Sequence, residues 1–587
     1  MLLAALTEKL TPVITSLGLP ESCARVTVAD RPDLADVQCN GALQGAKALG
    51  QPPRAIAEKI VAAIKEDAQL SGSFSDITIA GPGFINFKLA PSYLAAQLTV
   101  QSGDKKFGFV VPPSKKILLE YNSPNMAKDM HVGHLRNTML GDAVKRMLQF
   151  SGHNVITDNH LGDWGLQLGQ VFSELQRQQP NLPYFQDMDG PFPSEAPMTF
   201  EELCVIYPLA SKKAKEDPAE LARAQDFTAQ LHNGHKGLRA LWQHIVTMSV
   251  ADIKKKLDEI DVESMDTWYG ESYMEQYIPM MMDELAKKNI TEEIDGAIGI
   301  QVAQPDDKFD IPPLILAKKM GGVTYGATDL ATFYQRQKDF DPDVCIVLTD
   351  FRQELHFERV YRAAKRAGYA DRMEFVHLMY GTINGNDGKP YKTRAGSTPR
   401  FEELVYLSFD KARERLKEIK LNEKLSPEEF EATARQIGLA SIKFGDLINH
   451  RRSDYIFDID KFVSFEGKTG PYIQYTAVRI NALLAKAKEQ GAQSGRIAVD
   501  EHQHEVALLL LQFPEIVLEA ATQYAPNILA DYLFRLAQGV NRYYQNVHVL
   551  SESDAEKRGA ALAFLQLSAR ILTQGLSLIG IMVPTKM

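Results

Sequence analysis

Two histidines, in the stretch His131-Val132-Gly133-His134, are the residues of this chain best suited to chemistry. They follow an apolar segment at 117–119 and a polar loop at 122–128, and apolar side chains then recur at helical spacing as far as Met147. The pattern predicts that the histidines lie where a strand passes into the first turn of a helix. A helix start offers unpaired N–H groups and a partial positive charge, which attract phosphate. The histidines can donate to phosphate oxygens, and Gly133 lets a flat ring such as adenine approach the backbone.

The motif alone leaves other interpretations open. A four-residue His-x-Gly-His pattern often arises by chance, and a His-x-x-His pair can be half of a metal site. A metal cluster of His131, His134, His153 and His160 is disfavoured, because no carboxylate or thiolate stands at ligand spacing. By itself the motif favours nucleotide binding no more than its alternatives.

Size and composition restrict the class of protein. The chain has 587 residues, enough for more than one domain, and a formal net charge of −10. This charge argues against non-specific binding of DNA or RNA over the whole surface, but not against a folded RNA held by local patches. The longest apolar runs, such as 506–511, are too short to cross a bilayer, and residues 1–9 indicate a helix rather than a signal peptide. Four dispersed cysteines indicate neither a zinc ribbon nor a disulfide framework, so we expect a cytoplasmic protein without membrane contact.

The N-terminal residues, 1–110, are expected to form a small α+β domain. Helical periodicity covers 2–17 and 53–68. A hairpin is predicted from strands at 75–80 and 84–87 around Gly81-Pro82-Gly83.

Residues 111–450 alternate strands with helices. Strands are predicted at 117–121, 154–158, 344–348 and 375–379, and helices at 131–150, 166–177 and from 354 onward. This alternation predicts a Rossmann-like parallel sheet covered by helices, with ligand at the carboxyl ends of the strands. An insertion at about 179–300, largely polar and helical, interrupts the alternation.

The remaining residues, 451–587, are expected to form an all-α bundle. Helical periodicity runs through 506–513, 528–541 and 561–579. Aromatic and basic side chains are interleaved in this region, namely Tyr472, Tyr475, Arg479, Tyr532, Arg535, Arg542, Tyr543 and Tyr544. Such side chains can stack on unpaired RNA bases, although tyrosines at helical spacing usually pack in cores.

Several stretches resemble the class I arginyl-tRNA synthetases. The longest runs from Glu120 through the two histidines to Asn137. Others lie, in family order, at 38–42, 80–86, 159–165, 266–272, 387–396, 465–475 and 580–587. The resemblance therefore extends over the whole chain, and chance cannot plausibly produce that set.

The resemblance implies ATP-dependent ligation of L-arginine to tRNA(Arg) through an arginyl-adenylate. It also implies ATP with Mg²⁺ held mainly by phosphates and water, a requirement for tRNA during activation, and a monomer. It assigns residues 1–110 to an additional tRNA-contacting domain, 111–450 to catalysis, and 451–587 to anticodon binding.

Five residues are expected to act on the phosphates. His131 and His134 stand at the helix start, and Lys128 precedes them with a full positive charge. Lys392 and Arg394 stand where class I enzymes carry a Lys-Met-Ser-Lys-Ser loop, but this chain has no Ser-Lys-Ser. Either Arg394 holds the pyrophosphate as a bidentate donor, or Lys128 replaces the missing lysine, and we expect a shared role. Without the family context these lysines are ordinary solvated loop residues.

Recognition of arginine requires paired acceptors, because guanidinium presents five donors in a fixed fork. The resemblance assigns this task, and the binding of the substrate backbone, to Glu120, Asn125, His160, Tyr325, Asp329 and Gln353. An i,i+4 pair such as Tyr325 and Asp329 is otherwise usually a surface pair. His160, with its neighbours Asp163 and Trp164, either touches a ribose or only shapes a turn.

For tRNA, the resemblance assigns the outer corner of the molecule to the N-terminal domain and the anticodon to the C-terminal bundle. The matching stretches contain Asn40 and Phe84 in the former, and Tyr475, Arg479, Tyr532 and Arg542 are candidates in the latter. Two other interpretations are a small nucleotidyltransferase, which leaves the C-terminal region unexplained, and a catalytically silent tRNA-binding protein, against which the intact site residues argue.

Overall fold

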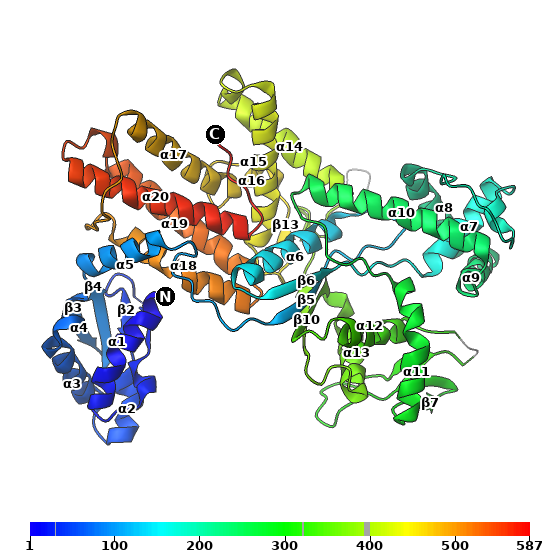
Figure 1. The fold of residues 1–587 in the computed structure, drawn as a ribbon, viewed down its shortest axis with the longest axis horizontal. Coiled ribbons are helices and arrows are strands. Elements are labelled where there is room, and N and C mark those ends of the chain that lie inside the picture. Colours follow the sequence, from blue (N-terminus) through cyan, green and yellow to red (C-terminus); the bar gives the residue numbers. More distant parts are fainter. Residues whose placement is uncertain (30, 320–321, 393–398) are drawn as a thin grey trace. The chain divides into compact units, whose positions relative to one another are not determined.

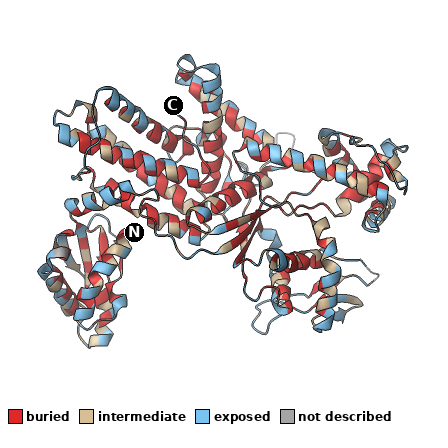
Figure 2. Cartoon of the chain, in the orientation of Figure 1, coloured by how far each residue is buried: buried red, intermediate tan, exposed pale blue. Residues whose placement is uncertain are grey.

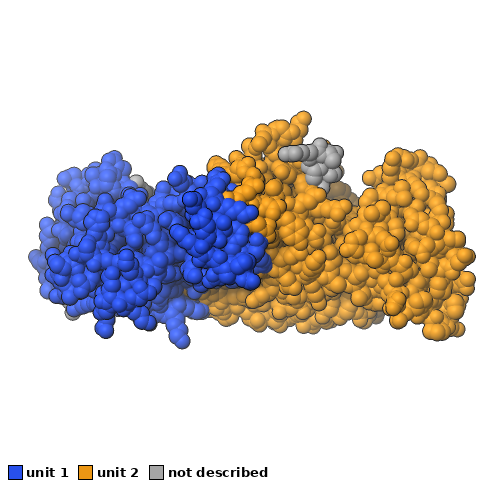
Figure 3. Space-filling view, turned by 90° about the horizontal axis from the view of Figure 1, so that it is seen from above, with its two compact units in different colours: residues 1–112, 415–440, 463–587 blue, residues 113–414, 441–462 orange. Residues whose placement is uncertain are grey.

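The computed structural model describes the chain from 1 to 587 except residues 30, 320–321 and 393–398 and the side chain of Gln69. The chain divides into two compact units (Figure 3). The first unit consists of residues 1–112, 415–440 and 463–587, and the second of residues 113–414 and 441–462. No helix in the described part of the chain is long and apolar enough to cross a membrane.

The second unit contains the predicted parallel sheet, which confirms the expected fold class (Figure 1). Its strands, in spatial order, are β11 (Glu374–Tyr380), β10 (Val344–Asp350), β5 (Lys116–Glu120) and β6 (Asn154–Asp158). All neighbouring pairs are parallel. The helices α6 (Val132–Phe150), α12 (Tyr325–Asp339) and α13 (Glu354–Ala367) turn apolar residues inward, so that strands and inner helix faces are buried (Figure 2).

The strand register aligns the polar ends of the strands. Glu120 pairs with Asp158 on one side and Val347 on the other, and Asp350 pairs with Tyr380. These carboxyl ends therefore lie along one edge of the sheet, where ligands bind in open α/β folds.

The insertion contains two substructures. Helix α7 (Leu166–Gln178) packs with the insertion helices around an apolar core; these helices are α8 (Phe200–Glu216), α9 (Pro218–His232) and α10 (Lys236–Glu259). Next come η3 (Glu271–Gln276) and α11 (Ile278–Lys287). A small antiparallel sheet follows, made of β7 (Glu292–Ile294), β8 (Ala297–Ile300) and β9 (Leu314–Ala317). The sequence did not predict this sheet, because three- and four-residue strands leave too short a period-2 signal.

The second unit also contains a two-stranded parallel pair, β12 (Ile383–Asn384) with β13 (Tyr455–Ile456). Helices α14 (Phe401–Glu418) and α15 (Pro427–Leu447) each contribute residues to both units, and α16 (Ile459–Phe462) is short. Buried Arg136 of α6 fastens this region, because it pairs with buried Asp446 at 3.4 Å and donates to the carbonyls of Thr382, Arg451 and Ser453.

The first unit begins with the predicted α+β domain. Its antiparallel sheet has the order β1-β2-β4-β3, with β1 (Val26–Val28), β2 (Val37–Cys39), β3 (Phe74–Ala80) and β4 (Phe84–Leu89). The hairpin β3–β4 was predicted, whereas β1 and β2 are three-residue strands that sequence periodicity missed. The accompanying helices are α1 (Leu2–Ser16), α2 (Gly41–Leu49), α3 (Pro53–Glu66), α4 (Ala68–Ser71) and α5 (Pro91–Gly103).

The C-terminal part of the first unit is all helical, as predicted. Its long helices are α17 (Gly470–Glu489), α18 (His504–Thr522), α19 (Pro526–Asn546) and α20 (Ala555–Leu578). They bury a continuous set of leucine, isoleucine, alanine and phenylalanine side chains (Figure 2).

Candidate active site

A cleft of about 770 Å³ lies along the carboxyl edge of the parallel sheet. Its volume is in the range of small-molecule sites. Ten of the predicted site residues line it, namely Glu120, Asn125, His131, Gly133, His134, His160, Tyr325, Asp329, Gln353 and Lys392. The sheet topology thus brings together residues that are far apart in the sequence.

The two histidines form the first turn of α6. The imidazole Nδ1 of His131 accepts the N–H of Gly133 at 3.0 Å, and Nδ1 of His134 accepts the N–H of His131 at 3.1 Å. This reciprocal cap satisfies two of the backbone donors that a helix start leaves unpaired. Because each Nδ1 accepts a hydrogen bond, each neutral ring carries its proton on Nε2, which remains a donor toward the cleft.

Both imidazoles are held neutral. Burial lowers the pKa of His134 to about 3, helped by the neighbouring His131 and by the charge of Lys128. Burial also lowers the pKa of His131, together with the charges of Lys128 and Arg352. The pair therefore supplies N–H donors of fixed orientation rather than imidazolium charges.

Gly133 is required by a close approach within the motif itself. A Cβ at this position would stand 2.9 Å from Cε1 of His131 and 3.1 Å from its Nδ1. From the sequence, this glycine is explained by the close approach of an adenine ring. The structure adds a second reason, because the glycine also makes room for the folded-back ring of His131.

The loop between β5 and α6 is held rigidly. Asn122 adopts a left-handed backbone with φ +76°, and Ala127 another with φ +62°. The side chain of Asn137 accepts the N–H of Asn122 at 2.6 Å and donates to the carbonyl of Leu348 at 2.7 Å, so α6, the loop and the end of β10 are joined. A fixed loop presents its donors without reorganisation cost.

Lys128 does not line the cleft in this structure. Its ammonium lies 4.9 Å from the ring centroid of Tyr207 in α8. It is nevertheless close enough to lower the pKa of both histidines. A cation–π contact of this kind stabilises by about 1 kcal/mol, so a phosphate can draw the lysine away.

The cleft has other basic residues near the histidines. Lys392 lines it and is exposed, whereas Arg394 lies outside the described residues. Sequence reasoning missed Arg352, which also lines the cleft. Its guanidinium is held by Asp350 through two hydrogen bonds of 2.8 Å, and its charge acts on His131.

Asp329 and Tyr325 share one wall of the cleft with His356. Nε2 of His356 donates to Oδ2 of Asp329 at 2.5 Å, and its ring makes an edge contact with Tyr325 at 5.5 Å. The i,i+4 spacing on α12 places the two predicted residues together, and His356 of α13 orients the carboxylate. The other oxygen of Asp329 stays available for a substrate donor.

Glu120 already has a partner within the protein. It forms a buried ion pair with Arg336 of α12, which also reaches Asp158 at 3.3 Å. Burial raises the pKa of Glu120, but the charge and hydrogen bond of Arg336 outweigh burial and lower the net value. Glu120 is thus a charged residue of the cleft wall that already pairs with Arg336, and its contact with the substrate stays a prediction.

Glu271, at the start of η3, is a cleft carboxylate that sequence reasoning did not single out. Burial raises its pKa to about 7; His160 opposes this shift, and Asp329 and Asp163 add to it. Both ring nitrogens of His160 are buried without a hydrogen-bond partner among the described residues. A perturbed carboxyl beside an unsatisfied imidazole in a cleft is typical of a ligand-binding position.

The neighbours of His160 shape the turn. Asp163 is buried and accepts the N–H and the hydroxyl of Ser272 at 2.9 and 2.6 Å. Trp164 stacks on His232 and receives Arg239 over its ring, so it packs on the insertion. Of the three, only His160 lines the cleft, so Asp163 and Trp164 shape the turn rather than touch a ribose.

The candidate RNA contacts of the C-terminal bundle separate by burial. Tyr532 is 0% exposed and its hydroxyl donates to the carbonyl of Leu509 at 2.8 Å, whereas Tyr475 is 39% exposed. A fully buried ring cannot stack on a base, so the prediction for Tyr532 is wrong. Arg479 lies 3.9 Å from the ring centroid of Tyr544, and Arg542 is exposed beside Glu505.

In the N-terminal domain, the strand register places Asn40 and Phe84 at the same sheet end. Cys39 of β2 pairs with Ile85 of β4, so the next residue of one antiparallel strand faces the preceding residue of the other. Both Asn40 and Phe84 are half-buried. They form one small polar and aromatic edge.

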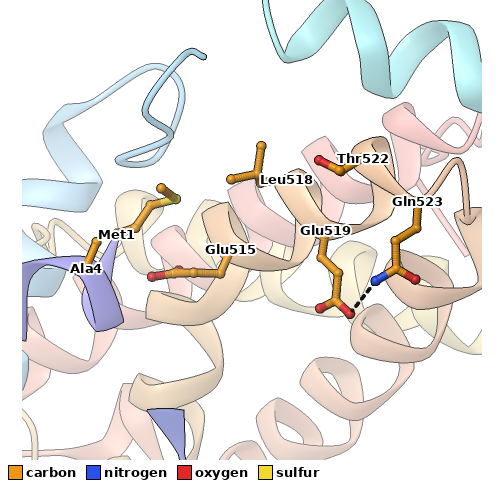
Figure 4. Close-up of a pocket in the computed structure, with 7 residues that line it drawn as sticks. All are labelled: Met1, Ala4, Glu515, Leu518, Glu519, Thr522 and Gln523. Atoms are coloured by element: carbon orange, nitrogen blue, oxygen red, sulfur yellow. Dashed lines mark hydrogen bonds between the residues drawn. The ribbon is translucent and has the colours of Figure 1, made fainter. Parts of the chain in front are cut away.

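A smaller hollow of about 290 Å³ lies in the first unit, between the start of α1 and α18 (Figure 4). Among the described residues that line it are two carboxylates, Glu515 and Glu519, and no basic side chain. It therefore does not suit a phosphate, and the cleft on the parallel sheet remains the candidate active site.

Comparison with family models covers most of the chain. Residues 97–459 match the catalytic domain of class I tRNA synthetases (R), residues 473–587 match a DALR anticodon binding domain, and residues 2–89 match an arginyl tRNA synthetase N-terminal domain.

Individual proteins are similar over the full length. The arginine–tRNA ligase of Alkaliphilus oremlandii is 44% identical over 98% of both chains, and that of Maricaulis maris is 40% identical over 97% of both. The arginyl-tRNA synthetase structure from Thermus thermophilus covers 100% of both chains at a TM-score of 0.77 and 24% identity. That from Plasmodium falciparum covers 99% of both at 0.78 and 23% identity. The two structures support the fold.

Proposed function

Because the chain belongs to the class I arginyl-tRNA synthetases, its activity is the ATP-dependent ligation of arginine to tRNA, and we propose how its cleft activates arginine. The observation that carries the proposal is a separation of charge within one cleft. The cations Lys128 and Arg352 lie near His131, whereas the carboxylate of Asp329 lies with His160 near Glu271. One region of the cleft thus suits phosphates and the other a guanidinium.

In the phosphate region, the Nε2–H groups of His131 and His134 donate to ATP. The arginine carboxylate attacks the α-phosphorus, an acyl–phosphate bond forms, and pyrophosphate leaves. Charge that develops on the phosphate oxygens is stabilised by the helix start and by Lys392, Arg352 and Lys128. These groups are donors and cations rather than metal ligands, so Mg²⁺ would be held by phosphate oxygens and water, as hard cations commonly are.

In the carboxylate region, the substrate guanidinium takes the free oxygen of Asp329 and the carboxylate of Glu271. Tyr325, Gln353 and Asn125 also line the cleft, and Gln353 and Asn125 are assigned to the substrate backbone. Two acceptors from different elements match the fork of a guanidinium, which a single ammonium cannot fill.

Substrate analogues test this assignment. Arginine-dependent exchange of pyrophosphate into ATP, with tRNA present, is expected for arginine and not for lysine or citrulline at equal concentration. Lysine cannot bridge two carboxylates, and neutral citrulline leaves them unpaired, which reduces the specificity constant by about 10⁴-fold. Efficient exchange with citrulline would contradict a charge-based site.

The pH dependence of arginine binding is expected to follow Glu271. Its pKa of about 7 in the free protein means that lowering the pH below 7 protonates the carboxylate that must face the guanidinium. The KM for arginine should therefore rise by up to about tenfold per pH unit below 7 and level off above it. The control is Glu271→Gln, which should have a high KM that no longer changes between pH 6 and 8. If the KM of this variant still rose below pH 7 as it does in the native protein, another group would be responsible for the titration.

For tRNA, we propose that the edge with Asn40 and Phe84 contacts the outer corner of the molecule, and that Tyr475, Arg479 and Arg542 contact the anticodon. Tyr475 and Arg542 are exposed, and exposed aromatic and arginine side chains support base stacking. We further propose the domain limits 1–110, 111–450 and 451–587, a cytoplasmic location and a monomeric state.

A further inference from the structure

Lys256 of α10 is a buried lysine next to the histidine motif. It is 1% exposed. Its ammonium lies 2.7 Å from Asp129, 2.6 Å from Asp252 and 3.7 Å from Glu402. Burial lowers the pKa of Lys256, but the hydrogen bonds that its ammonium donates to Asp129 and Asp252 outweigh burial and raise the net value, so the group is charged.

The partners of Lys256 belong to three segments of the same unit. Asp252 is on α10 itself, Asp129 lies between Lys128 and His131, and Glu402 is in the first turn of α14. The insertion helix therefore holds both the loop that carries Lys128 and the segment that follows Lys392.

The backbone joins the same two segments directly. The N–H of Val132 donates to the carbonyl of Pro399 at 3.2 Å, and that of Phe401 donates to Met130 at 3.0 Å. Arg400, between them, reaches Asp129 at 3.4 Å. Residues 399–402, which follow Lys392 in the chain, are thus bonded to residues 129–132 at the start of α6. We call this contact the junction, and Lys256 is the buried charge next to it.

Stability alone does not account for a lysine here. Replacing a buried ion pair by apolar side chains is often neutral or stabilising, whereas a buried charge fixes one arrangement of its partners. The arrangement that Lys256 fixes is the attachment of residues 129–132, next to Lys128 and at the histidine motif, to residues 399–402, which follow Lys392 in the chain.

We propose that Lys256 is a positioning residue for arginine activation. By fixing Asp129 and the start of α14 to α10, it keeps the loop with Lys128 and the segment after Lys392 in register around the α-phosphate. The proposal rests on the phosphate roles proposed above for Lys128, His131 and Lys392.

The test compares rate with binding. In pyrophosphate exchange with tRNA present, Lys256→Met is expected to lower kcat by about 10²-fold, the cost of a displacement of roughly 1 Å, while the KM for arginine changes less than about twofold. Lys256→Arg, which keeps the charge, should recover most of kcat. The matched control is Lys145→Met: Lys145 is also buried and ion-paired, to Glu263 at 2.8 Å, near the other end of α6. It should lower the melting temperature without changing kcat.

A double-mutant cycle separates this inference from the proposed function. If Lys256 acts through the loop, Lys256→Met should cost less in the Lys128→Ala background than in the native protein. Full kcat of Lys256→Met, measured below its melting temperature, or multiplicative effects of the two changes would overturn the inference.

Should Lys256→Met not fold, Arg400→Gln removes an exposed member of the same junction. It should lower kcat with the KM for arginine unchanged, and a native kcat would overturn the inference. An unchanged rate of Lys128→Ala alone would instead count against the proposed role of Lys128.

Discussion

Asp329→Asn is expected to raise the KM for arginine by about 10²- to 10³-fold, with a much smaller effect on the KM for ATP. Removing one partner of a desolvated charge pair costs about 2–5 kcal/mol, because the substrate guanidinium is left without its counter-charge. The change also disturbs the bond from His356, which holds the carboxylate at 2.5 Å. Arginine-dependent exchange measured over a wide range of arginine concentration gives the two constants.

The control lies on the same helix. Asp339, ten positions later at the end of α12, accepts from Tyr277 and Gln335, both at 2.8 Å, and does not line the cleft. Asp339→Asn should leave both KM values unchanged. Equal effects of the two substitutions would mean that Asp329 stabilises α12 rather than binding arginine.

Lys128→Ala is expected to lower kcat for adenylate formation by about 10²- to 10³-fold, the usual cost of losing one donor to transition-state charge. The KM for arginine should change little, because Lys128 does not touch the carboxylate region. Single-turnover formation of adenylate, with tRNA present, separates this effect from transfer to tRNA.

The resting position of Lys128 sharpens this prediction. Its ammonium lies on Tyr207 and must turn toward the phosphates to act. Lys212→Ala, an exposed lysine of α8, is the matched control and should retain native kcat. If Lys392→Ala abolishes the reaction while Lys128→Ala does not, the charge is supplied by the loop at 392 and the shared role is excluded.

Most of the fold could be predicted from local patterns. The four strands of the parallel sheet, the hairpin of the N-terminal domain and the helices of the C-terminal bundle all carry periodicity over several residues. The strands that were missed, β1, β2, β7–β9, β12 and β13, have two to four residues, and they are defined by their pairing partners rather than by their own pattern.

Local patterns did not predict which side chains are exposed and which already have a partner within the protein. Tyr475 and Tyr532 have the same side chain in the same kind of helix, and only the packing of α17 to α20 shows that one faces solvent and the other the core. The position of Glu120 at a strand end likewise gave no sign of Arg336 of α12, which the fold brings against it. Local sequence carries no information about which distant side chain satisfies a charge.

The sequence by itself determined the strand–helix alternation, the histidine pair at a helix start, and the family. Helical and strand periodicity are local, and several stretches that resemble one family, in family order, are read directly from the chain. Only the tertiary structure decided that the histidines are neutral Nε2–H donors, that Glu271 stands with Asp329 in the cleft, and that Lys256 lies behind Asp129. These properties depend on burial and on contacts between remote segments, which packing creates and spacing does not record.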